Sequence, residues 1–169
     1  MQKIIFISGP IGSGKTTIAS ELYKRLDNVA LIEADKMVTF NPCDMSKQIF
    51  RVRSENCDAL IQTYLNENVQ NIICEGYIQN QFELDAFEEI FKSRAKIKLF
   101  WLELSREERQ ERVADRGQGV EDTPEFMDEY ENANSQPWPF TSESTKLKSI
   151  ELENKSSDDI VKVIVESLD

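Results

Sequence analysis

The chain has 169 residues, about the size of one domain, and its 40% hydrophobic and 30% charged residues are typical of a soluble globular protein. It contains no histidine, which excludes Ser-His-Asp and Cys-His nucleophiles, imidazole acid–base chemistry and zinc sites built with histidine. The net charge of −11 disfavours nucleic acid as a partner, because binding its phosphates requires clustered lysine and arginine.

Apolar runs alternate with helical patterns from one end of the chain to the other. The predicted strands, which are short apolar runs, cover residues 3–8, 29–32, 71–75, 97–104 and 147–152. The predicted helices cover residues 15–26, 46–66, 81–93, 105–116, about 123–133 and 157–168. This alternation predicts an α/β fold of three layers, in which a five-stranded, mostly parallel sheet has helices on both faces. We expect residues 1–169 to form a single domain.

A glycine-rich turn follows the first predicted strand and opens the first predicted helix. Residues 9–16 read Gly-Pro-Ile-Gly-Ser-Gly-Lys-Thr and match the phosphate-binding pattern GxxxxGK[ST]. Glycine lets backbone N–H groups approach phosphate oxygens, and the helix N-terminus adds a partial positive charge. Lys15 can reach the β- and γ-phosphates, and the Thr16 hydroxyl can bind Mg²⁺. The predicted nucleotide-binding residues are Gly9, Pro10, Ile11, Gly12, Ser13, Gly14, Lys15, Thr16 and Thr17.

Two acidic residues stand at the end of the second predicted strand. With a period of two, Glu33 and Asp35 point to the same side, beyond the carboxyl end of a parallel strand. Ligands of open α/β sheets bind in the crevice at that edge. Both carboxylates are therefore candidates for a functional site.

Three arginines of the predicted helix 105–116 share one face. Arg109, Arg112 and Arg116 stand at i, i+3 and i+7, within about 60° of one another. Phosphoryl transfer spreads negative charge over the oxygens of the transferred group, so guanidinium groups that close over it stabilise that charge and exclude water. We predict Arg112 and Arg116 as catalytic groups on a lid at about residues 112–124, and Arg112 as a nucleotide contact. The alternative is surface pairing with neighbouring glutamates.

These features together resemble the small P-loop kinases of the shikimate kinase, gluconate kinase and chloramphenicol phosphotransferase type. The resemblance rests on residues 9–16, on Glu33-Ala34-Asp35 and on the arginine-bearing helix that leads to Gly117. The order of elements agrees over nearly the whole chain. Gln118 stands where gluconate kinases usually carry histidine, and residues 75–79 match neither nucleotide kinases nor shikimate kinases. The substrates of these relatives therefore do not carry over.

The resemblance implies roles for the acids that follow the second strand. In such kinases the first acid usually holds Mg²⁺ through water, and the second accepts a proton from the substrate hydroxyl or orients it. This implies Glu33 as a magnesium partner beside Thr16, and Asp35 as a catalytic, acceptor-binding residue. The alternatives are a solvated strand end for Glu33 and a helix N-cap for Asp35.

Two further pairs are candidates for the acceptor site. Glu75 and Gly76 end the third predicted strand, where Glu75 could bind Mg²⁺ through water or meet the acceptor hydroxyl. The alternative for Glu75 is a hydrogen-bonded strand end without a role in the site. Arg51 and Arg53 lie on the helix after the second strand, where the related kinases place arginines that bind a carboxylate or phosphate. Residues two apart cannot share a helical face, so we expect at most one of these arginines to face the site.

The loop after the last predicted strand corresponds to the adenine pocket of such kinases, which implies Asn154 as a nucleotide contact. Residues 154–158 read Asn-Lys-Ser-Ser-Asp and superficially resemble the guanine-reading motif NKxD. The aspartate is one residue too far along, and no DxxG follows the third strand. We therefore expect ATP, with Mg²⁺, as the cofactor.

The remaining features bear on location and partners. Cys43, Cys57 and Cys74 show no CxxC spacing, which suggests buried, reduced thiols. No stretch approaches the ~20 apolar residues of a membrane span. We expect a cytoplasmic monomer or homodimer that binds neither membranes nor nucleic acid.

The sequence thus predicts an ATP-dependent phosphotransferase that moves the γ-phosphate of Mg-ATP to a hydroxyl of a small molecule. One alternative is a nucleoside or nucleotide kinase, which should carry a fuller motif at residues 75–79. Another is a non-catalytic nucleotide-binding sensor or ATPase that acts through a protein partner. The presence of Asp35 favours an acceptor over a sensor.

Overall fold

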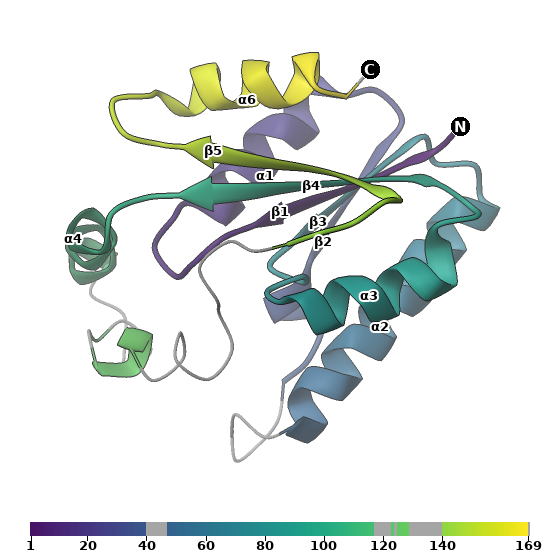
Figure 1. The fold of residues 1–169 in the computed structure, drawn as a ribbon, viewed down its shortest axis with the longest axis horizontal. Helices are drawn as coiled ribbons and strands as arrows, with labels where there is room; N and C mark the ends of the chain where they lie inside the picture. The colour runs from purple at the N-terminus through teal and green to yellow at the C-terminus, as the bar shows by residue number, and fades with distance from the viewer. Residues whose placement is uncertain (40–46, 117–122, 124, 129–139, 169) are drawn as a thin grey trace.

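A five-stranded parallel sheet forms the centre of the molecule (Figure 1). The computed structural model describes residues 1–39, 47–116, 123, 125–128 and 140–168. The strands are β1 (Lys3–Ser8), β2 (Val29–Glu33), β3 (Asn71–Glu75), β4 (Lys96–Glu103) and β5 (Thr145–Glu151). Their order is β2-β3-β1-β4-β5, and every neighbouring pair is parallel. The predicted α/β fold is confirmed.

Helices cover both faces of this sheet. They are α1 (Lys15–Arg25), α2 (Lys47–Asn66), α3 (Gln81–Phe91), α4 (Arg106–Arg116) and α6 (Ser157–Glu166). A short 3₁₀ helix, η1 (Ala34–Lys36), follows β2 directly. Figure 1 shows α1 and α6 on one face of the sheet and α2 and α3 on the other, while α4 lies beyond the carboxyl end of β4. The strand carboxyl ends therefore face α4 and the two turns that follow β1 and β3.

Two apolar cores hold these layers together. Because successive side chains of a strand alternate, Phe6 of β1 packs with α2 and α3, whereas Ile7 packs with α1 and α6. Phe6, Phe87 and Phe91 are completely or almost completely buried. Each such side chain contributes about 1.5–3 kcal/mol to the free energy of unfolding. The site described below thus rests on a sheet that is packed on both sides.

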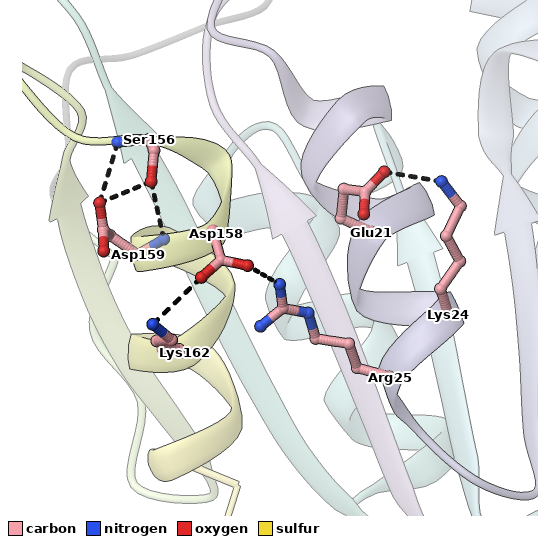
Figure 2. A network of polar contacts seen from close by, with 7 residues as sticks. All are labelled: Glu21, Lys24, Arg25, Ser156, Asp158, Asp159 and Lys162. Atoms are coloured by element: carbon pink, nitrogen blue, oxygen red, sulfur yellow. Dashed lines mark hydrogen bonds and ion pairs between the residues drawn. The ribbon is translucent and has the colours of Figure 1, made fainter.

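Polar contacts attach α6 to α1 at the surface (Figure 2). Arg25, the last residue of α1, forms an ion pair with Asp158 in the first turn of α6. Lys162 Nζ lies 3.1 Å from the same carboxylate, at Oδ2. Ser156 and Asp159 form a capping box that fixes where α6 begins. These exposed pairs place the last helix on its neighbour but contribute little energy individually.

Strand β5 begins two residues before the predicted start at residue 147. Thr145 is polar but buried, and its hydroxyl hydrogen bonds to Glu88 of α3, so it did not belong to the apolar run. In the predicted helix 123–133, the structure describes residue 123 and a helical segment at 125–128. Most of the predicted lid, 112–124, lies beyond the described residues. Within the part of the chain that is described, none of the helices is long and apolar enough to span a membrane.

Candidate functional site

The glycine-rich turn between β1 and α1 has the backbone of a phosphate-binding loop. Gly9, Gly12 and Gly14 have φ values of +142°, +80° and +86°, which L side chains rarely adopt. Lys15 Nζ donates hydrogen bonds to the carbonyl oxygens of Gly9 (2.9 Å) and Pro10 (3.0 Å). The lysine ammonium group is therefore held over the loop, at the N-terminus of α1, where an anion binds favourably.

Helix α4 packs directly on this loop through Arg109. A Cβ atom placed on Gly12 would lie 2.8 Å from the Arg109 carbonyl oxygen, so only glycine allows this approach. Arg109 is 6% exposed, and its Nη1 donates a hydrogen bond to the Ile11 carbonyl oxygen at 3.1 Å. Its Nε donates to the carbonyl oxygen of Leu104 at 3.3 Å. Arg109 thus fixes the loop against the segment that leads from β4 into α4.

Arg112 lies at the other side of the loop. A Cβ atom placed on Gly14 would be 3.7 Å from Arg112 Nη1, so this guanidinium group stands beside the start of α1. Arg112 is exposed, in contrast to the buried Arg109. The side chain of Arg116 lies outside the part that the structure describes. The shared helical face thus contains one arginine that supports the loop and one that is available to a ligand.

Thr16 contacts an acid at the end of β3. Its hydroxyl donates a hydrogen bond to Glu75 Oε1 at 3.1 Å, and Glu75 is only 4% exposed. Burial raises the pKa of the Glu75 carboxyl, and the nearby Lys15 charge partly opposes that effect. A hydroxyl beside a carboxylate is a fitting pair of oxygen ligands for Mg²⁺, bound directly or through water.

The prediction that Glu33 is a magnesium partner beside Thr16 stays a prediction, and in the structure Glu75 contacts the Thr16 hydroxyl instead. Glu33 Oε1 lies 2.7 Å from Lys36 Nζ and is not the partner of the Thr16 hydroxyl. The physical reason is the strand order, because β3 lies between β2 and β1. Glu33 is paired in register with Glu75 but is one strand farther from the loop. Glu75 is therefore the better candidate for the acidic partner of Mg²⁺.

Asp35 stands at the same edge of the sheet, next to Gly76. A Cβ atom placed on Gly76 would lie 3.6 Å from Asp35 Oδ2, and Gly76 itself has a φ of +73°. The Gly76 N–H donates to the Ile7 carbonyl oxygen at 3.2 Å, which ties this turn to the end of β1. Asp35 lies within η1, whose N-cap is Glu33, so Asp35 is not the N-cap of that helix. Its side chain is 72% exposed and open to a ligand.

A buried arginine holds this exposed carboxylate. Arg53 Nη1 lies 3.3 Å from Asp35 Oδ1, although the Arg53 side chain itself is only 5% exposed. Its Nη2 lies 3.8 Å from Oε1 of Glu83, at the start of α3, and its guanidinium carbon lies 5.1 Å from the centre of the Phe50 ring. Arg51, by contrast, is exposed and approaches Glu55 on the surface of α2 (3.9 Å, Nη1 to Oε1). Of the two predicted arginines, Arg53 alone reaches Asp35.

Glu83 is a residue of this site that sequence reasoning missed. It lies in the first turn of α3, where its N–H donates to Asn80 Oδ1 (3.0 Å) and its Oε2 accepts from the Gln79 N–H (2.6 Å). Burial raises the pKa of its carboxyl. The spacing Asn80-x-x-Glu83 is that of a capping box, which could have located the start of α3. Nothing in that spacing indicated that the carboxylate also meets Arg53.

The two remaining predictions concern Asn154 and the cysteines. Asn154 is exposed, has a φ of +57°, and lies in the turn after the edge strand β5. Strand β4 lies between β5 and β1, so Asn154 and the phosphate-binding loop follow strands that are not neighbours in the sheet. The role of Asn154 as a nucleotide contact stays a prediction. Cys57 and Cys74 are buried and not disulfide-bonded, as expected, whereas Cys43 lies outside the described residues.

A protein-family model described as an AAA domain (AAA_18) matches residues 5–138, a span that includes the phosphate-binding loop, Asp35, Glu75 and α4. The chain belongs to this AAA-domain family. No curated protein matches it by sequence. The resemblance to small P-loop kinases is confirmed at the level of family and fold.

Several solved kinase structures share the fold of this family member across nearly its whole length. A sugar kinase from Janibacter sp. HTCC2649 has a TM-score of 0.73 at 13% identity, covering 98% of this chain and 93% of its own. A gluconokinase from Sinorhizobium meliloti 1021 has a TM-score of 0.64 at 14% identity, covering 95% and 87%. A thymidylate kinase from Candida albicans has a TM-score of 0.65 at 17% identity, covering 99% and 90%. At these identities the likeness establishes the fold alone.

Proposed function

We propose that the protein is an ATP-dependent phosphotransferase that moves the γ-phosphate of Mg-ATP to a hydroxyl group of a small molecule. The observation that carries this proposal is the placement of Asp35. Its exposed carboxylate, held by buried Arg53, stands beside Gly76, at the strand edge that also carries Lys15 and the Thr16–Glu75 pair. A phosphate-binding loop and an exposed carboxylate at one edge of the sheet are suited to the phosphorylation of a hydroxyl group.

On the nucleotide side, the proposal assigns phosphate binding to the backbone N–H groups of residues 9–16 and to Lys15. Thr16 and Glu75 would hold Mg²⁺, which neutralises charge on the phosphates when it is bound. Arg112 would stabilise the charge that develops on the transferred group, because its guanidinium lies beside the N-terminus of α1. Arg109 would act only through the loop that it supports.

On the acceptor side, Asp35 would accept a hydrogen bond from the acceptor hydroxyl. The hydroxyl oxygen attacks the γ-phosphorus, the bond between that phosphorus and the β–γ bridging oxygen breaks, and ADP leaves. The hydroxyl proton passes to the Asp35 carboxylate. Positioning and electrostatic stabilisation supply most of the acceleration in such transfers, so the acceptor side needs few groups besides one well-placed carboxylate.

The test is ADP release from Mg-ATP with and without pooled acceptors: sugars, sugar acids, shikimate-like acids, nucleosides, nucleotides and hydroxylated antibiotics. We expect one pool to stimulate release in the wild type but not in Asp35→Asn. Asp27→Asn is the matched control, because Asp27 lies in the turn before β2, at the opposite edge of the sheet. Equal stimulation of Asp35→Asn would remove Asp35 from the mechanism, and ATP binding without stimulation by any pool would contradict the proposal.

A further inference from the structure

We propose that the acceptor is an uncharged polyhydroxylated molecule, and that Arg53 positions Asp35 instead of binding an anionic group of the acceptor. This inference rests on the proposed function and narrows its substrate class. It depends on the charged side chains around the Arg53 guanidinium group and on the hydrogen bonds that fix their positions.

Two carboxylates already share this one guanidinium group. Asp35 Oδ1 lies 3.3 Å from Nη1, and Glu83 Oε1 lies 3.8 Å from Nη2. The Phe50 ring covers the group at 5.1 Å, and Arg53 as a whole is 4% exposed. The formal charges of these three side chains sum to −1. A carboxylate or phosphate brought to this cluster would meet an arginine whose charge is already compensated, and it would have to lose its own hydration.

Glu83 cannot readily make room for such an anion. Its position at the start of α3 is fixed by two backbone hydrogen bonds, one to the Asn80 side chain and one from the Gln79 N–H to its own carboxylate. Its side chain is 18% exposed, so its rotation toward solvent would break the hydrogen bond from the Gln79 N–H and leave that donor without its acceptor. One edge of the guanidinium group thus faces a carboxylate that the protein itself holds in place.

Among the side chains that the structure describes, the other cations near these elements are paired or lie elsewhere. Lys36 is paired with Glu33, and Arg51 is exposed on the surface of α2. Lys15 is hydrogen-bonded to the phosphate-binding loop, and Arg112 of α4 stands beside that loop. The described carboxylates of Glu33, Glu75 and Glu83, which lie near Asp35 or its partner Arg53, therefore disfavour an anionic acceptor.

A cationic acceptor is disfavoured for a different reason. An ammonium group near Asp35 would compete with Arg53 for the carboxylate that the acceptor hydroxyl needs. An uncharged polyol or sugar meets neither difficulty, since its hydroxyls can donate to Asp35 and accept from other groups without a charge of their own.

The experiment compares matched acceptor sets, each with an uncharged, a carboxylated, a phosphorylated and an aminated member. Suitable sets are built on glucose, on a five-carbon polyol and on a nucleoside. From ADP release at saturating Mg-ATP, we expect kcat/KM for the best uncharged member to exceed that of its charged counterparts by about tenfold or more. A charged member preferred by the wild type would overturn this inference and leave the phosphotransferase function standing. No stimulation by any member would instead overturn the proposed function, and the inference with it.

Two variants test the assigned roles of Glu83 and Arg53. Glu83→Gln can still accept the hydrogen bond from the Gln79 N–H but removes one negative charge, so we expect the preference to shift about tenfold toward carboxylated and phosphorylated members. Asp85→Asn, an exposed position on the same helix, should leave the preference unchanged. Arg53→Lys should lower kcat for uncharged members with little change in KM. An unshifted preference in a folded Glu83→Gln protein, or a KM defect in Arg53→Lys confined to anionic members, would contradict the proposal.

Discussion

The Thr16 hydroxyl at the start of α1 donates a hydrogen bond to the buried carboxylate of Glu75 at the end of β3, 3.1 Å away. This contact joins the phosphate-binding loop to the neighbouring strand and gathers two oxygen ligands at one point. Because burial disfavours the charged carboxylate, the arrangement is costly without a cation. A bound Mg²⁺ would relieve that cost, so the pair is suited to hold a metal at the expense of stability.

Glu75→Gln is expected to lower acceptor-dependent ADP release about 10–100-fold, the usual cost of losing a side chain that supports a metal. The Gln side chain can still accept the Thr16 hydrogen bond, so the loop should remain in place. The measurement is the initial rate as a function of Mg²⁺ concentration. Glu33→Gln provides the comparison, and a larger loss in Glu33→Gln than in Glu75→Gln would show that the metal partner has been misassigned.

The same substitution should change how stability depends on pH. The folded-state pKa of Glu75 is raised above its ordinary value of 4.5 by burial, so the folded protein binds this proton more tightly than the unfolded chain. Its contribution to stability is fully present below 4.5 and is lost as the pH rises through the folded-state pKa. Denaturant unfolding of the metal-free protein over this range should show a smaller decline in Glu75→Gln. Parallel curves for the two proteins would contradict the assignment.

Alanine substitutions at Gly12 and Gly14 distinguish the cost of backbone strain from the cost of close packing. Both have a positive φ, but a Cβ atom on Gly14 would meet Arg112 Nη1 at an ordinary 3.7 Å, whereas one on Gly12 would meet the Arg109 carbonyl oxygen at 2.8 Å. We expect Gly14→Ala to cost about 1–2 kcal/mol of unfolding free energy through strain. Gly12→Ala should cost about 1–3 kcal/mol more, because α4 must move away from the loop. Equal losses by chemical denaturation would exclude tight packing of α4 on the loop.

Arg109 and Arg112 lie on one helix, but their substitutions should affect different properties. We expect Arg109 to matter for stability and Arg112 for activity. Arg109→Met removes buried hydrogen bonds to two carbonyl oxygens, so we expect the free energy of unfolding to fall by about 2–4 kcal/mol. Arg112→Met, at an exposed position, should change stability by no more than about 0.5 kcal/mol. Its kcat should fall on the order of 10²–10³-fold. Thermal unfolding and steady-state rates measure the two effects. A large loss of stability in Arg112→Met with little loss of kcat would contradict the role assigned to Arg112.

The parts of the fold that the sequence predicted well are those that depend on local pattern. The apolar runs located β1, β3 and β4 closely because central parallel strands are buried on both faces. The glycine pattern located the phosphate-binding loop because positive φ and close packing both require glycine there. Strand β5 was predicted less well, since its polar first residue, Thr145, is buried by a contact with Glu88 that is distant in sequence.

The candidate site was harder to predict because it depends on strand order. Glu33 and Glu75 both end strands with an acid, and only the position of β3 beside β1 decides which of them meets Thr16. The period of α2 predicted that Arg51 and Arg53 would diverge but did not indicate which would turn inward. Glu83 carried only a capping signal, whereas its ion pair with Arg53 depends on how α3 packs against α2.

The most direct test of the central claim is to follow the γ-phosphate itself. ATP labelled at the γ-phosphorus is incubated with Mg²⁺, the stimulating acceptor pool and the wild type, Lys15→Met or Asp35→Asn, and the products are separated. We expect label in a phosphorylated acceptor with the wild type and its loss in both variants, although Asp35→Asn should still bind ATP. Label released only as inorganic phosphate, or transferred equally well by Asp35→Asn, would contradict that claim.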